Sequence, residues 1–427
     1  MTEQTARAAR EAVRDAVERG WDDEVAFLRA LVGERSLRGM TAGAQLLVER
    51  RMRELALQPE RVAIEVEKLR GRPGYSPVDW SSAGEYDLSG RLPGATSDGR
   101  SLILNGHVDV VPSTPDDHWT RDPWGGEIEG GRMYGRGAAD MKAGVAAILA
   151  VVAAVRAAGV TLRGSLELQS VVEEECSGHG TLALLEAGHR ADAAIVPEST
   201  GQSLCTAHPG VLWCRVAVQG LGAHAETADA AVNAIERLWP LIAAVRELEA
   251  EVNQEAARHP AFAGLAHPLN YNLGTLHAGD WPSSVPEAAT MEIRFSYPPG
   301  ESVAGARRRI EEHLRRAAEE DPWLREVPPE ITWFGFAAEP AVYDTDDVLS
   351  RTLEQNHLQT VGKALARRPF AATIDNRFFA LYAGMPTACY GPTGDRYHAP
   401  DESVDLATVL QTTHVLAGTV LDWCGVA

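Results

Sequence analysis

Apolar residues recur at helical spacing through the first sixty positions, and this pattern predicts two or three helices at the start of the chain. After a loop that contains Pro73 and Gly74, the apolar residues gather in short runs instead. The run SLILNG, at residues 101–106, is nearly continuous, as in a strand that is buried on both faces. The elements predicted for this half alternate: strands 86–92 and 101–106, helix 139–158, strand 165–172, helix 179–187 and strand 193–196. Such alternation indicates an α/β fold with a mostly parallel sheet.

The pattern changes near residue 204, where strands and helices suggest a smaller α+β unit. Its predicted elements are strands 211–219, 271–276 and 290–296 and helices 232–252 and 303–318. Helix 346–357, strand 386–390 and helix 404–423 then resume the earlier style. A chain of 427 residues usually exceeds a single domain. We therefore predict a main domain formed by residues 1–208 and 326–427, with an α+β domain inserted at residues 209–325.

Charge narrows the range of partners. The chain has 40 Lys and Arg residues against 60 Asp and Glu residues, a formal net charge of −20. This charge repels phosphate backbones and anionic lipid surfaces, so we expect neither nucleic acid nor a membrane as a partner. The longest apolar run, residues 143–155, is also too short to cross a bilayer.

The cysteines and the first residues bear on location. The five cysteines are scattered and include no CxxC pair, which argues against a disulfide framework and fits a reducing compartment. The first 25 residues mix charges at helical spacing and lack the apolar core of a secretory signal. We therefore predict a cytoplasmic protein.

A histidine and an aspartate follow the buried strand directly, as His107-Val108-Asp109. Ligands of open α/β sheets bind at the carboxyl ends of the strands. Because side chains two apart in a strand point to the same side, Asp109 can accept a hydrogen bond from one ring nitrogen of His107 while the other nitrogen binds a cation. Taken alone, the pair is more typical of a histidine that ends a strand in a polar turn.

Asp140 lies in a glycine-rich loop, residues 135–144, that leads into the strongly apolar helix. A helix-terminal role alone would explain a carboxylate at this position. The glycine spacing matches no phosphate-binding loop, which disfavours nucleotide binding.

Further candidate ligands follow other predicted strands. Glu173, Glu174 and Glu175 come directly after strand 165–172, Glu198 follows strand 193–196, and His398 lies in a Gly/Pro-rich loop after strand 386–390. A divalent cation commonly makes such crowding of carboxylates favourable, although a solvated acidic turn explains the triplet about as well. Jointly, two histidines and at least three carboxylates at strand ends predict a site for two divalent ions. Zinc is the first choice, with cobalt or manganese as alternatives.

With these segments in this order, from NGHVDVVP at residues 105–112 to HAPDE at residues 398–402, the sequence resembles the M20 family of dinuclear metallopeptidases and amidohydrolases. That family includes acetylornithine deacetylase, succinyl-diaminopimelate desuccinylase, aminoacylases and bacterial glutamate carboxypeptidase. The resemblance covers nearly the whole chain. It implies a catalytic main domain and an inserted lid domain that forms a homodimer.

The resemblance also implies a role for each matching residue. It gives His107 and Glu198 to one metal, Glu175 and His398 to the other, Asp140 as the bridge, Glu174 as general base and Asp109 as the residue that orients the histidine. The family usually has Asp-Glu-Glu at the triplet, and here Glu173 replaces the aspartate. In an alternative register Glu173 would be the base and Glu174 a ligand. We prefer the later register because Gly180 then falls where the family has a glycine.

Five further positions are similar to family residues around the substrate. His224, in GLGAHA at residues 220–225, resembles a catalytic histidine that reaches the active site of the partner subunit. Asn272 and Arg294 align with insert positions that contact substrate, and Arg294 could bind a carboxylate through its two-pronged guanidinium. Arg377 and, through its backbone, the loop from Gly391 to Gly394 are further candidates for substrate binding.

The resemblance implies hydrolysis of the amide bond of a small N-acyl amino acid or related N-acylated amine. Glu174 would activate a hydroxide that bridges the two metals. The expected partner is then a small molecule that carries a carboxylate. Two alternatives use the same machinery: a dipeptidase or carboxypeptidase, and a deformylase or aminohydrolase acting on a small aromatic or heterocyclic amine. A non-catalytic, metal-stabilised binding protein is remote, because all five ligands and the base are present.

Overall fold

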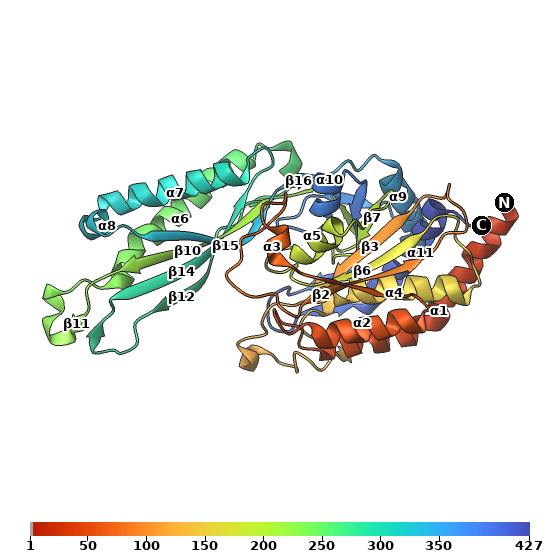
Figure 1. Cartoon of the computed structure of the whole chain (residues 1–427), viewed down its shortest axis with the longest axis horizontal. Helices are drawn as coiled ribbons and strands as arrows, with labels where there is room; N and C mark the ends of the chain where they lie inside the picture. The colour runs from red at the N-terminus through yellow and green to blue at the C-terminus, as the bar shows by residue number, and fades with distance from the viewer. Residues whose placement is uncertain (1–2) are drawn as a thin grey trace.

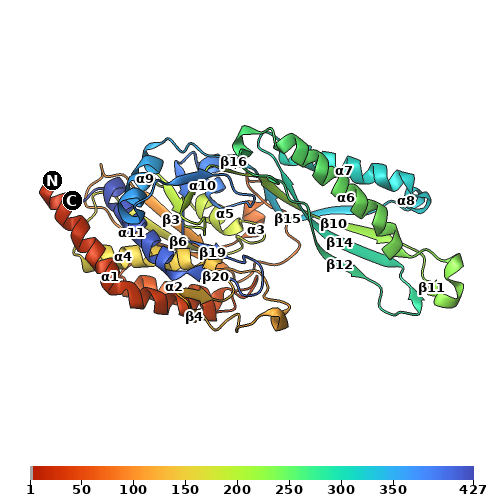
Figure 2. The same cartoon turned by 180° about the vertical axis from the view of Figure 1, so that it is seen from behind.

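The computed structural model describes residues 3–427, which form two domains side by side along the long axis of the molecule (Figure 1). Both ends of the described chain lie in the main domain, on the side away from the insert domain (Figure 2). Residues 1 and 2, which belong to the predicted main domain, lie outside the described residues. The predicted α/β fold with a mostly parallel sheet is confirmed.

A six-stranded sheet, in the order β1-β2-β6-β3-β7-β18, forms the centre of the main domain. Strands β6, β3, β7 and β18 run parallel, whereas β2 is antiparallel to both of its neighbours. The bounds are Glu60–Ala63 (β1), Tyr86–Leu92 (β2), Leu102–His107 (β3), Leu166–Val171 (β6), Ala194–Val196 (β7) and Thr387–Cys389 (β18). All six residues of β3 are buried, as its apolar run predicts.

Helices cover both faces of this sheet (Figures 1 and 2). On one face α4 and α11 pack on each other and on β3, and α1 and α9 pack against them; on the other face α5 and α10 contact each other. The main-domain helices are α1 (Glu3–Gly33), α2 (Ala42–Glu54), α3 (Val66–Leu69), α4 (Ala143–Ala157), α5 (His179–Glu186), α9 (Val348–Val361), α10 (Asn376–Ala383) and α11 (Leu406–Cys424). The stretch Ala138–Ala157 is long and apolar enough to span a membrane, but 83% of its most apolar window is buried in the fold, as in a core helix.

The insert domain is a four-stranded antiparallel sheet with two long helices on one face. The strands, in the order β12-β14-β10-β15, span Asn272–Ala278, Ala288–Tyr297, Gly210–Gln219 and Glu330–Ala338; the helices are α6 (Ala234–Ala256) and α7 (Val303–Glu320). Leu212, Cys214, Val216 and Val218 alternate along β10 and are buried in a second hydrophobic core. The period of two in the sequence thus gives this sheet one packed face.

The end of the insert differs from the predicted one. The sequence placed it at residue 325, but β15 pairs with β10 as far as Ala338. The insert therefore continues past the predicted boundary, because its fourth strand returns after α7. The chain crosses between the domains twice, and the two crossings pair as β9 (Ala207–His208) with β16 (Ala341–Val342).

Short elements complete the chain. They are β4 (Glu127–Glu129), β5 (Arg132–Tyr134), β8 (Ser203–Cys205), β11 (Ala223–His224), β13 (Ser284–Val285), α8 (Pro322–Glu326), β17 (Ala366–Arg368), β19 (Gly394–Asp395) and β20 (Ser403–Asp405). Strands β19, β20, β5 and β4 form a small sheet whose first two members contact residues 138–142. This sheet brings the loop of His398 to the loop of Asp140, more than 250 residues earlier in the chain.

Candidate metal centre and active site

The carboxyl ends of three parallel strands carry the polar residues singled out by the sequence. His107 is the last residue of β3, the glutamate triplet follows β6, and Glu198 follows β7 by two residues. Since these strands are parallel neighbours, their carboxyl ends meet at one edge of the sheet. These residues therefore lie together at the carboxyl edge of the sheet, as the sequence predicts.

The five predicted ligands come together in two groups that share one carboxylate. His107, Asp140 and Glu198 form one group, and Asp140, Glu175 and His398 form the other, with ligand atoms within 4.8 Å of one another. Asp140 presents a different oxygen to each histidine. Its Oδ1 lies 3.2 Å from His107 Nε2, and its Oδ2 lies 3.3 Å from His398 Nε2. Such a shared carboxylate can bridge two cations.

The ligand atoms of both groups are of the types that bind zinc and similar divalent ions. Glu198 Oε1 lies 3.3 Å from His107 Nε2, and Glu175 Oε2 lies 3.1 Å from His398 Nε2, so each group combines one imidazole with carboxylates. Mixed nitrogen and oxygen donors suit zinc, cobalt and manganese. The geometry thus agrees with the ligand set that the family resemblance implies.

The pKa shifts of the side chains at this edge also favour a cation site. Burial, reinforced by neighbouring carboxylates, raises the pKa of Glu174 well above its ordinary value and that of Glu198 to about 7. Although burial lowers the pKa of His107, its hydrogen bonds to Asp140 and Glu198 raise it well above the usual value. Protons are thus favoured on Glu174, Glu198 and His107, whereas Asp140, despite its burial, has its pKa lowered by hydrogen bonds from His107 and His398. Bound cations would neutralise the same charge and leave the ligands ionised.

Asp109 orients two parts of the site. His107 Nδ1–H donates to the main-chain oxygen of Asp109 at 2.9 Å, whereas the Asp109 Oδ1 atom is 3.6 Å away. The carboxylate instead accepts from the main-chain N–H groups of Glu174, at 3.3 Å, and Glu175, at 3.2 Å. The predicted side-chain bond to the histidine is thus replaced by a main-chain bond. Nε2 of His107 remains directed to the ligand group, and Asp109 positions the glutamates as well.

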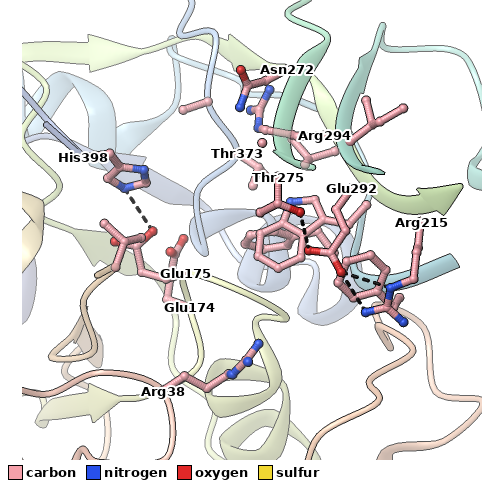
Figure 3. Close-up of a pocket in the computed structure, with 18 of the residues that line it drawn as sticks. Arg38, Glu174, Glu175, Arg215, Asn272, Thr275, Glu292, Arg294, Thr373 and His398 are labelled. Atoms are coloured by element: carbon pink, nitrogen blue, oxygen red, sulfur yellow. Dashed lines mark hydrogen bonds and ion pairs between the residues drawn. The ribbon is translucent and has the colours of Figure 1, made fainter. Parts of the chain in front are cut away.

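The triplet turns sharply, and the side chain of Glu173 points away from those of Glu174 and Glu175. Glu173 has a left-handed backbone with φ of 62°, and its buried carboxylate accepts from Ser82 and, at 2.7 Å, from Ser177 Oγ. Glu174 and Glu175 face a cavity instead (Figure 3). Glu174 Oε2 is 4.0 Å from His107 Nε2, beside both ligand groups without belonging to either. This placement agrees with the later register, in which Glu174 is the base.

Glu402 holds the loop that presents Asp140. Its buried carboxylate accepts hydrogen bonds from the main-chain N–H groups of Gly137, Ala139 and Asp140 at 3.0–3.1 Å, and from Arg136 Nη1 at 2.5 Å. The peptide bond after Asp140 is cis. Gly137 adopts φ of 77°, and a side chain there would clash with Val110. No sequence pattern indicated a role for Glu402.

A cavity of about 430 Å³ lies between the two domains and opens onto this edge. Its main-domain wall includes Arg38, Glu174, Glu175, Thr373 and His398; its insert wall includes Trp213, Arg215, Asn272, Thr275, Glu292, Arg294, Phe334 and Phe336 (Figure 3). Asn272 and Arg294, both predicted to bind substrate, are cross-strand partners on β12 and β14. Burial lowers the pKa of Arg294 to about 10. Its guanidinium bonds Ser296 Oγ at 2.8 Å and, within residues 3–427, forms no ion pair.

Three predicted site residues lie elsewhere. Arg377 is fully buried on α10, where its Nη1 donates to Asp375 Oδ1 at 3.1 Å, so the helix directs it into the core and away from substrate. Gly394 packs against Ala139, and its N–H meets the Tyr397 hydroxyl at 3.1 Å, also outside the cavity wall. His224 is exposed on β11, at the end of the insert far from the main domain (Figure 1).

Several cavity residues escaped the sequence analysis. Arg38 follows α1 in a loop with no distinctive pattern, and the position of Trp213 in its strand is also typical of a packing residue. Thr275, Glu292, Phe334 and Phe336 belong to strands whose wall-facing side becomes evident only when the insert is placed against the main domain. Alternation along residues 330–338 could have identified β15, and with it the two phenylalanines.

An α/β sheet edge with two adjoining His/carboxylate groups beside a small-molecule cavity defines a metallohydrolase-like protein. The chain matches the model of peptidase family M20/M25/M40 over residues 103–422, and it belongs to this family. The resemblance derived from the sequence is thereby confirmed. The protein is a hydrolase of the M20 family.

Two similar proteins carry the same name. The chain is 30% identical, over 353 residues, to an N-formyl-4-amino-5-aminomethyl-2-methylpyrimidine deformylase from Halalkalibacterium halodurans, covering 76% of this chain and 79% of the relative. It is 28% identical over 376 residues to the protein of the same name from Bacillus subtilis, covering 82% and 86% of the two chains. Both are deformylases by name, which agrees with a hydrolase that acts on C–N bonds.

Solved structures agree on the fold. Human carnosine dipeptidase 1 aligns over 97% of this chain and 98% of its own, with a TM-score of 0.77 and 16% identity. The di-peptidase Dug1p from Saccharomyces cerevisiae aligns over 98% and 99%, with a TM-score of 0.80 and 12% identity. At such identities the likeness concerns the architecture of both domains.

Proposed function

We propose that this protein is a dinuclear, metal-dependent amidohydrolase that removes a formyl or other small acyl group from the nitrogen of a small amine. The observation that supports this proposal most strongly is the pair of ligand groups that share Asp140. Glu174 lies beside them and lines the cavity. Zinc is our first choice of ion, with cobalt or manganese as alternatives. His107 and Glu198 would hold one ion and Glu175 and His398 the other.

Each side chain has a part in the reaction. Bound divalent ions would supply a water of lowered pKa and a Lewis acid for the amide carbonyl. Glu174 takes a proton from the attacking water and returns it to the leaving nitrogen, which departs as the amine. Asp109 holds His107 and the main chain of the glutamate turn in place. The cavity of about 430 Å³ admits a small molecule and excludes a folded protein.

The two deformylase relatives support a formyl group as the acyl group removed. A second candidate reaction, deacylation of an N-acyl amino acid or hydrolysis of a dipeptide, is favoured by Arg294. Arg294 lines the cavity, and its guanidinium, which donates to Ser296 Oγ and to main-chain oxygens of Asn270 and Ala371, has no carboxylate partner among the described residues. It could therefore bind a substrate carboxylate.

We further propose a homodimer formed through the insert, in which His224 reaches the partner's active site. Strand β12 is an edge of the insert sheet, and Leu276 and Trp281, beside that edge, are 49% and 68% exposed. Edge strands and exposed apolar side chains commonly pair with another chain. The cytoplasm is the proposed location, since all five cysteines are buried and free.

The test is an assay of purified protein loaded with zinc, cobalt or manganese on a substrate panel. The panel contains N-formyl amines, N-acetyl amino acids and dipeptides, and free amine is measured. Preferred cleavage of N-formyl amines is the expected result. Preferred cleavage of N-acyl amino acids or dipeptides would select the second candidate, and no cleavage of any amide with two ions bound would refute both.

A further inference from the structure

The two histidines of the candidate metal groups are held in place very differently. The side chain of His107 is 1% exposed at the end of a buried strand, and its Nδ1–H donates to the main-chain oxygen of Asp109. The side chain of His398 is 51% exposed. Within residues 3–427 its ring interacts with Asp140 and Glu175, in both cases through Nε2 (Figure 3). The position of His398 therefore depends on the main chain that carries it.

That main chain is strained. In residues 394–402, which we call the His398 loop, Arg396, His398 and Asp401 have φ of 57°, 58° and 60°. Residues with a side chain seldom adopt this left-handed conformation and stay in it only where the surrounding structure fixes them. The ends of the loop are fixed, because residues 394–395 pair with β20 and Asp401 accepts from the Thr120 N–H at 2.8 Å. The middle of the loop needs a support of its own.

Tyr397 supplies this support. Its hydroxyl donates to the main-chain oxygen of Ser199 at 3.0 Å and accepts from the Gly394 N–H at 3.1 Å. A Cβ on Gly394 would come within 2.7 Å of the Tyr397 ring and 2.5 Å of Ala139 Cβ, so the close approach of the ring requires a glycine. Among the described residues, the bond to Ser199 is the one hydrogen bond that joins residues 396–400 to a residue outside the His398 loop.

Ser199 is a firm anchor for the Tyr397 hydroxyl. It follows the ligand candidate Glu198, just beyond β7, which pairs with β3 on one side and β18 on the other. Ser199 Oγ also donates to the main-chain oxygen of Ala139 at 2.6 Å, next to the shared ligand candidate Asp140. The Tyr397 hydroxyl thus ties the exposed His398 loop to main chain that the sheet and the Asp140 loop already hold.

We propose that Tyr397 is a positioning residue that acts through His398 and sets the affinity of the Glu175–His398 group for its divalent ion. Tyr397 belongs to neither ligand group and does not line the cavity, so it contacts neither ion nor substrate. Loss of its hydroxyl frees the middle of the loop, and the exposed imidazole then loses its fixed direction. The group of His107 keeps its own supports. This inference rests on the proposed two-metal function and deepens it.

The test is a calorimetric titration of the metal-free protein with cobalt, with the visible spectrum of the bound cobalt recorded in parallel. Tyr397→Phe keeps the ring against Gly394 and removes only the hydroxyl. It should weaken one of the two binding steps by about tenfold and leave the other within about twofold. His398→Ala identifies the affected step, because it removes a ligand of that ion. Tyr382→Phe, which removes a partly buried hydroxyl that bonds Glu339, is the matched control and should change neither step.

A double variant shows whether Tyr397 acts through the histidine. In the His398→Ala protein, Tyr397→Phe should cause no further loss of affinity, because the side chain that it positions is already absent. Two unaltered steps in Tyr397→Phe, or equal weakening of both, would overturn the inference. The titration contains no substrate, so its result is separate from amide hydrolysis. The expected change in cobalt binding, without cleavage of any amide, would refute the proposed reaction and leave the role of Tyr397 intact.

Discussion

The main-chain N–H of Asp140 donates a hydrogen bond to the Glu402 carboxylate at 3.1 Å. Asp140 is the ligand candidate that both metal groups share, and Glu402 follows His398, another ligand candidate, in one loop. The loop of His398 therefore holds the loop of Asp140 in place. Glu402 is fully buried and touches neither cavity nor ligand atoms. Glu402 therefore contributes to the site by holding the Asp140 loop in position.

We predict that Glu402→Gln weakens binding of zinc or cobalt by about 10- to 100-fold, as loss of the groups that support metal ligands usually does. Gln cannot accept all four donors or neutralise Arg136. Titration of the metal-free protein with each ion measures the effect, and Asp117→Asn, an exposed carboxylate, is the control. Unaltered affinity in a folded Glu402→Gln protein would remove this role; circular dichroism establishes folding.

Glu174→Gln should retain both ions and lose about 10²- to 10⁴-fold in kcat, since the proton shuttle is removed while the ligand groups stay intact. Glu173→Gln is the informative comparison. Its side chain binds Ser82 and Ser177 away from the cavity, so we expect a lower unfolding temperature with most of kcat kept. A large loss of kcat in Glu173→Gln, with most of kcat kept in Glu174→Gln, would favour the alternative register of the triplet.

His224 has no route to the metal groups of its own chain, because β11 lies at the far end of the insert (Figure 1). If it serves the partner, His224→Ala and His107→Ala should each be inactive as homodimers. Mixed dimers should regain up to about half of the wild-type activity, since one of two sites is then complete. Purified heterodimers with two different tags provide the measurement. Absence of any recovery would argue against action across the dimer.

Glu24 makes stability depend on pH. Burial raises the pKa of this carboxyl on α1 to about 8, against an ordinary value of 4.5, and Thr413 Oγ1 donates to it at 2.7 Å. The folded state therefore retains a proton that the unfolded chain loses. The stabilisation is complete below about pH 4.5 and is lost as the pH rises through about 8.

Glu24→Gln mimics the protonated form, and it should therefore be more stable than wild type above pH 8. The expected difference is on the order of 4 kcal/mol, and it should vanish near pH 4.5. Denaturant unfolding at several pH values measures it, with the exposed Asp22→Asn on the same helix as control. A pH-independent difference between Glu24→Gln and wild type would contradict the assignment.

Local patterns predicted the framework well. Residues 86–92 and 101–106 became β2 and β3, because burial on one or both faces imposes a periodicity that sequence retains. The predicted helix 303–318 is α7 with two further residues. The last insert strand, β15, was missed although Ile331 and Trp333 alternate with polar residues, and the domain boundary shifted with it.

The sequence predicts those parts of the candidate site that lie at strand ends or match the family motifs. His107, Glu175 and Glu198 could be placed at one sheet edge from the strands that they follow, whereas His398 joins them only through the small sheet of β19, β20, β5 and β4. Glu402 binds main-chain N–H groups more than 260 residues earlier, and such partners leave no residue pattern. Arg377 failed as a substrate residue because the orientation of α10 depends on tertiary packing.

The central claim is that two divalent ions, held in groups that share Asp140, are required for amide hydrolysis. The most direct measurement is a titration of metal-free protein with zinc or cobalt, with bound metal and hydrolysis of an N-formyl amine followed together. Activity should be absent without metal and rise until about two ions are bound per chain. Full activity in the metal-free protein, or an activity maximum at a single bound ion, would contradict the claim.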